Sequence, residues 1–212
     1  MSFPFFYIVL VIAVLISVIK LKRQKPSYLR LFFPYLLMNL CVETFGLITR
    51  AQGKNNYWIY NFSTTVEFGF YFFIFYKTLH NVFVKRAIIF TSFLFFPFCI
   101  INIFFIQGIH HFHSISFLMG SIFLVSLSVL YFQEQLREDE QITNPLTEKM
   151  FWISTGVLFF YVTSLFSLGL FELIHLKNPS LKVLADALLN LLNIFLYCTF
   201  IISFFIGNKN ER

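Results

Sequence analysis

Four acidic residues lie inside or at the ends of long apolar segments of this sequence: Glu43, Glu67, Glu172 and Asp186. Insertion scales put the cost of a charged side chain at the centre of a membrane at about 2.5–3.5 kcal/mol. Such residues therefore face a bundle interior, a partner or a water-filled cavity. With little basic charge expected nearby, these carboxyl groups must be protonated, hydrated or bound to a cation.

Uncharged polar residues accompany these acids at helical spacing. Asn39 and Glu43 are four residues apart, and Thr64 and Glu67 are three apart. Residues at such spacings share one face of a helix. Tyrosines extend the same pattern at Tyr60, Tyr71 and Tyr197. We predict a ligand-binding site lined by Asn39, Glu43, Asn61, Thr64, Glu67, Glu172, Asp186, Asn190 and Asn193.

Other chemistries have weaker support in the residues. His111 and His113 are two residues apart, and no pair of histidines has the i, i+4 spacing of a helical metal site, so no metal is predicted. The sequence contains neither a Gly-x-Ser-x-Gly elbow nor a phosphate-binding glycine loop. No lysine occurs between Val183 and Ile206 to carry a retinal Schiff base. No cofactor is therefore expected.

The elements that position these residues are predicted to be membrane-spanning helices. Hydrophobic residues make up 58% of the 212 residues and charged residues only 12%, whereas soluble domains carry about 25% charged residues. A helix needs about 20 apolar residues to cross a membrane. We expect an all-α, polytopic membrane protein that forms a single domain over 1–212. Its expected helices are 3–20, 28–49, 57–78, 86–107, 113–133, 151–175 and 183–206.

The distribution of basic residues predicts the orientation of these helices. One side of the membrane would carry only Arg50, Lys54, Lys177 and Lys182, and all other lysines and arginines would lie on the opposite side. Since cytoplasmic loops are enriched in Lys and Arg, the N-terminus is expected outside and the C-terminus in the cytoplasm. This pattern also explains the net charge of +6 without nucleic-acid binding. The expected location is the inner membrane of a bacterium, with lipid as the surrounding partner.

This orientation places the polar residues of the different helices at a similar depth. Segments 28–49 and 151–175 run outward and carry their polar residues late, whereas 57–78 and 183–206 run inward and carry theirs early. Glu67 is the deepest of the acids. The pattern predicts a polar cavity that opens to the outside above an apolar inner half.

Two family resemblances bear on function. The stretch Phe-Trp-Ile-Ser-Thr-Gly at 151–156 resembles standalone seven-helix bacterial proteins, and the whole plan resembles the seven-helix sensor modules that precede bacterial histidine kinases. This resemblance implies a sensor or accessory role. The helix count is also similar to the 3+1+3 plan of PQ-loop and SWEET transporters, with Tyr60, Asn61 and Asn190 at equivalent depths. However, the chain has no Pro-Gln dipeptide.

Four functional hypotheses follow. The first is a sensor-like protein that binds a small polar or cationic ligand and signals through a separate cytoplasmic partner. The second is a small-solute transporter in which Glu67 carries the substrate or coupling charge. The third is a membrane-embedded enzyme that uses the acids, histidines and a metal on lipid. In the fourth, the polar stripes only join helices, at about 0.6 kcal/mol per hydrogen bond.

Overall fold

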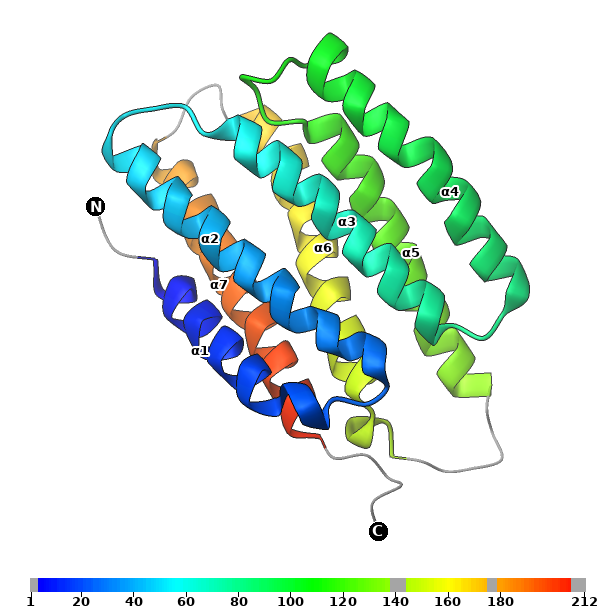
Figure 1. Cartoon of the computed structure of the whole chain (residues 1–212). Helices are drawn as coiled ribbons and strands as arrows, with labels where there is room; N and C mark the ends of the chain where they lie inside the picture. The colour runs from blue at the N-terminus through cyan, green and yellow to red at the C-terminus, as the bar shows by residue number, and fades with distance from the viewer. Residues whose placement is uncertain (1–3, 138–143, 175–178, 207–212) are drawn as a thin grey trace.

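The protein is a bundle of long helices (Figure 1). The computed structural model describes residues 4–137, 144–174 and 179–206, and the side chains of these segments except for 137 and 168–186. Helices in this part of the chain are α1 Phe5–Lys20, α2 Phe32–Ala51, α3 Tyr57–Thr78, α4 Val82–Ile101, α5 Ser114–Arg137, α6 Lys149–Ile174 and α7 Pro179–Phe205. A π-helical turn, Asn102–Ile106, extends α4. The described residues contain no strand, so the all-α expectation is confirmed.

Six of these helices are long and apolar enough to cross a membrane, which makes this a multi-pass membrane protein by length and composition. The helix that does not qualify among the described residues is α3. It carries Asn61, Glu67 and several hydroxyl side chains, which lower its hydropathy although it has 22 residues. The predicted helix at 57–78 therefore exists with the expected bounds, but its hydropathy alone does not identify it as a membrane span.

The third helix lies at the centre of the bundle, between α2 on one side and α4 and α5 on the other (Figure 1). Its Phe68 is fully buried. The Phe68 ring lies 5.5 Å from Phe95 of α4, 5.9 Å from Phe117 of α5 and 5.7 Å from Tyr161 of α6, between ring centroids. The polar residues Asn61, Ser63 and Thr64 of α3 are buried as well, whereas Glu67 is half-buried.

The remaining helices pack around this centre. α7 packs against α1 and α6, and α6 also packs against α5. Gly156 allows the close approach of α6 and α7, because a methyl group there would overlap the hydroxyl of Thr199. α1 and α4 lie at opposite edges of the bundle (Figure 1). α4 exposes Phe83, Phe90 and Phe93 at 79%, 65% and 75%, as expected of a surface that faces hydrocarbon.

Hydrogen bonds join the loops at each end of the bundle. At one end, Asn55 Nδ2 donates to the His110 carbonyl at 2.9 Å, which links the α2–α3 and α4–α5 loops. At the other end, Lys149 Nζ donates to Gln24 Oε1 at 3.0 Å. The α2–α3 and α4–α5 loops thus lie together at one end of the bundle, and the α1–α2 loop and the start of α6 lie together at the other.

The observed helix bounds differ from the prediction by four residues at the starts of α2, α4 and α7 and at the end of α5. The start of α4 has a local cause. This helix begins at Val82 rather than at residue 86, because Asn81 Oδ1 accepts hydrogen bonds from the backbone N–H groups of Phe83 and Val84 at 2.9 and 3.4 Å. An asparagine is a strong helix N-cap, so this start was recognisable in the sequence. Lys85 consequently belongs to the first turns of the helix rather than to a loop.

Candidate functional site: a buried carboxyl and tyrosine cluster

Glu67 lies near the middle of α3 and connects three helices. Its Oε1 atom accepts hydrogen bonds from Tyr35 Oη of α2 at 2.9 Å and from Tyr161 Oη of α6 at 3.0 Å. The exposed fractions of these tyrosines are only 5% and 0%. A hydroxyl buried among aromatic rings needs a partner, and the carboxyl oxygen supplies one for both.

Two further tyrosines complete the cluster. Tyr71 lies one turn after Glu67 on α3, and its Oη is 2.9 Å from that of Tyr35. The Tyr35 ring stacks on Phe70 at 4.1 Å between centroids, which fixes the position of its hydroxyl. Tyr197 of α7 is buried within electrostatic range of Glu67. Four helices thus contribute phenol groups around one carboxyl group.

The second oxygen of Glu67 is free to interact with something else. No described residue forms a hydrogen bond with Oε2, and yet this atom is not fully enclosed. The Glu67 side chain as a whole is only half-buried, although its tyrosine partners are buried. Oε2 can therefore accept a hydrogen bond or an ionic contact from a further group.

Glu43 of α2 forms a second acidic position in the same region. Its Oε2 accepts a hydrogen bond from Tyr60 Oη of α3 at 3.3 Å, and its side chain is half-buried. Gly46, one turn later, makes room for the Tyr60 phenol, because a methyl group at this position would overlap the hydroxyl. Glu43 and Glu67 are close enough to interact electrostatically, and Tyr197 is in range of both.

Neither carboxyl group is paired with a basic side chain among the described residues. Arg50, on the same face of α2, is exposed at the end of the helix. Two neighbouring acids without a counter-charge can share a proton or bind a positively charged group. The arrangement can thus accept a cation or an acidic proton, with phenol groups to orient either one.

Other predicted residues line the same faces. Thr64 is buried three positions before Glu67, and Asn39 is half-buried four positions before Glu43. Asn190 and Asn193 are half-buried on α7, on the helix face that also carries Tyr197. Asn193 Nδ2 donates to the Leu189 carbonyl at 2.9 Å, so its amide group is held against its own helix.

Asn61 does not lie with the carboxyl groups. It is fully buried near the start of α3, where Nδ2 donates to the His111 carbonyl at 2.8 Å and Oδ1 accepts from the His113 N–H at 3.1 Å. Both ends of its amide therefore hold the α4–α5 loop. The side chains of Glu172 and Asp186 lie outside the described residues, so their predicted role stays a prediction.

The prediction missed Tyr35 and Tyr161, the two residues that bind Glu67 directly. Tyr35 had a signal, because Tyr35, Asn39 and Glu43 follow one another at four-residue spacing on α2. Tyr161 had no such signal, since no series of polar residues at four-residue spacing precedes it on α6. Only the packing of α6 against α3 brings its hydroxyl to the carboxyl group.

Comparison with known proteins adds nothing to this picture: the chain matches no protein-family model, no curated protein and no solved structure.

Proposed function

We propose that this protein crosses a bacterial cytoplasmic membrane seven times, binds a small positively charged solute at Glu43 and Glu67 from the outside, and signals through a separate partner. The proposal rests on the hydrogen bonding of the Glu67 carboxyl group. One of its oxygens is held by two buried tyrosines, the other is open, and no described cation neutralises it.

The length and the neighbours of α3 support the seven-span topology. Its 22 residues rise about 33 Å at 1.5 Å per residue, enough to cross the hydrocarbon core. Because other helices enclose its polar face, the low hydropathy of α3 does not oppose a crossing. The loop that carries Gln24 and Lys25 and the start of α6 at Lys149 meet at one end of the bundle, as expected for a cytoplasmic side rich in basic residues.

A receptor accounts for the packing below the site better than a transporter does. The inner half of the bundle beneath Glu67 is filled by fully buried aromatic residues, including Phe32, Phe75 and Phe200. The rings of Phe32 and Phe200 lie 5.1 Å apart between centroids and join α2 to α7. Such packing closes the path to the cytoplasm, and a solute that enters from outside would stop at Glu67.

Binding is tested with simple organic cations as probes. Tetramethylammonium and guanidinium should raise the melting temperature of the purified protein above that in the same concentration of sodium chloride. The double variant Glu43→Gln, Glu67→Gln should lose this increase, whereas Glu148→Gln, which changes a carboxyl group near the start of α6, should keep it. An unchanged increase in the double variant would show that these carboxyl groups are not the site.

Access to the site is tested by thiol labelling from each side of the membrane. Cys41, Cys99 and Cys198 are first replaced, and single cysteines are placed at Thr64, Asn190, Asn193 or Tyr197. A membrane-impermeant reagent should react from outside only. Reaction from both sides would instead favour the transporter, and no reaction from either side would mean that the polar residues only join helices.

A further inference from the structure

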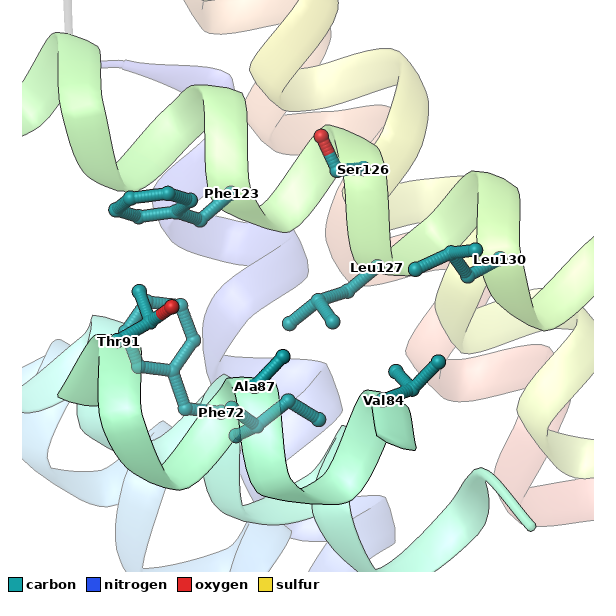
Figure 2. Close-up of a pocket in the computed structure, with 9 residues that line it drawn as sticks. Phe72, Val84, Ala87, Thr91, Phe123, Ser126, Leu127 and Leu130 are labelled. Carbon is teal, nitrogen blue, oxygen red and sulfur yellow. The ribbon is translucent and has the colours of Figure 1, made fainter. Parts of the chain in front are cut away.

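A cavity that does not include the carboxyl groups opens between α4 and α5 (Figure 2). Its volume is about 180 Å³. α4 contributes Val84, Ala87 and Thr91 to its walls, and α5 contributes Phe123, Leu127 and Leu130. Figure 2 shows Phe123, Thr91 and Phe72 gathered at one end and Val84 and Leu130 at the other, so the cavity is elongated along the helices.

The walls of this cavity suit hydrocarbon. Ser126 is one of its few polar lining residues, and its hydroxyl donates to the Ile122 carbonyl of its own helix at 2.9 Å. α4 forms one wall and lies at the edge of the bundle (Figure 1). Since this edge faces lipid in a membrane, the occupant with direct access is an acyl chain.

Positive charge collects beside the Val84 end of the cavity. Tyr76 follows Phe72 by one helical turn on α3, and two ammonium groups lie over its ring. The Nζ atoms of Lys77 and Lys85 are 5.8 and 5.7 Å from the ring centroid. Cations at this distance are attracted to the face of an aromatic ring. Both ammonium groups are thereby held near the same aromatic ring.

No described carboxyl group neutralises these lysines. Glu134 of α5 is the nearest acid along the helix that forms the wall, one turn after Leu130. Its oxygens accept hydrogen bonds from the backbone N–H groups of His80 and Asn81 at 2.9 and 3.0 Å, just before α4 begins. The Glu134 carboxylate thus interacts with the α3–α4 loop, and Lys77 and Lys85 can bind an anion.

We propose that an anionic phospholipid binds here, with its phosphate at Lys77 and Lys85 and one acyl chain between α4 and α5. Basic pockets between membrane helices on the cytoplasmic side are typical sites for anionic headgroups. Under the proposed orientation, the lipid comes from the cytoplasmic leaflet. The site is independent of Glu43 and Glu67, so either proposal can fail without the other.

The test is a lipid competition measured by native mass spectrometry. The purified full-length protein is equilibrated with equal amounts of phosphatidylglycerol and phosphatidylcholine, and the retained lipids are counted. The wild type should retain phosphatidylglycerol preferentially. The variant Lys77→Gln, Lys85→Gln should lose roughly 10- to 30-fold of this preference, at about 1 kcal/mol for each lysine near an anionic headgroup.

A matched control separates this site from general surface charge. Lys22→Gln, Arg23→Gln also removes two basic residues after α1, at the same end of the bundle, but both side chains are exposed and away from the cavity. This variant should keep the preference for phosphatidylglycerol. Equal losses in the two double variants, or no loss in either, would overturn the proposal.

A third variant tests the position of the acyl chain. Ala87→Phe fills the cavity from an exposed position on α4, so the fold should be retained. It should release the bound phosphatidylglycerol, whereas Ala51→Phe, at the exposed end of α2, should not. Retention of the lipid in Ala87→Phe would show that the chain does not lie between α4 and α5.

Discussion

At Glu67, one carboxyl oxygen accepts hydrogen bonds from the hydroxyls of two buried tyrosines. Substituting Tyr161 with Phe keeps the buried ring and removes one of these hydrogen bonds. A bond to an acidic group contributes about 1–3 kcal/mol, so Tyr161→Phe should lower the free energy of unfolding in detergent by that amount. The control is Tyr57→Phe, whose side chain is exposed at the start of α3. Equal stability of Tyr161→Phe and the wild type would contradict the observed bond.

Gly46 and Tyr60 form a second testable contact at this scale. Gly46→Ala places a methyl group against the Tyr60 hydroxyl and should destabilise the protein by about 1–3 kcal/mol, the usual range for overpacking. In a Tyr60→Phe background the cost should be smaller, because the overlapping atom is absent. The nearest remaining ring carbon would lie 3.0 Å from the methyl, so some cost should persist. A double-mutant cycle measures the coupling, and strict additivity would count against the contact.

We predict that His113 makes the stability of the protein depend on pH. It lies between membrane segments, is fully buried, and burial lowers the pKa of its imidazole from 6.5 to about 4. Folding thus favours the neutral ring, and this stabilisation is complete above pH 6.5 and is lost as the pH falls towards 4. The free energy of unfolding should drop by about 3 kcal/mol more over this range in the wild type than in His113→Gln. His110→Gln, an exposed site in the same loop, should keep the wild-type profile.

At the scale of the element, Asn61 determines how the α4–α5 loop is held. Asn61→Ala leaves the His111 carbonyl and the buried His113 N–H without their partner. Each such group costs about 1–3 kcal/mol, so the expected loss of stability is large. Asn55→Ala removes two exposed hydrogen bonds, one to the His110 carbonyl of the same loop and one from the Tyr57 N–H, and should cost less because water can replace them. Similar losses in the two variants, measured by denaturant unfolding in detergent, would show that the buried clamp is not important.

At the scale of the whole molecule, the direction of α3 decides the topology. Single cysteines replacing Lys54, before this helix, and His80, after it, should react with an impermeant reagent from opposite sides of the membrane. Both positions are exposed, so the reagent can reach them. We expect Lys54 on the outside and His80 in the cytoplasm. Labelling of both from the same side would mean that α3 does not cross, and the seven-span proposal would be wrong.

Local properties of the sequence were sufficient to predict the class of protein and the positions of its helices. Length and apolar composition predicted the helical segments, and α3 has the predicted bounds. The start of α4 differed because the Asn81 cap was not considered. Pro34 is the third residue of α2, in the first turn, where a proline breaks no helical hydrogen bond.

The contacts of the site required the tertiary structure. Helical spacing placed Glu43 and Glu67 on polar faces, because such spacing is a property of a single helix. Which side chains of different helices contact one another depends on how each helix is rotated about its axis and on which helices are its neighbours. Local sequence patterns encode neither property. The sequence by itself therefore determined a helical membrane protein with acids on polar helix faces. Only the positions of α2, α6 and the α4–α5 loop against α3 decided that tyrosines hold Glu67 and that Asn61 holds a loop instead.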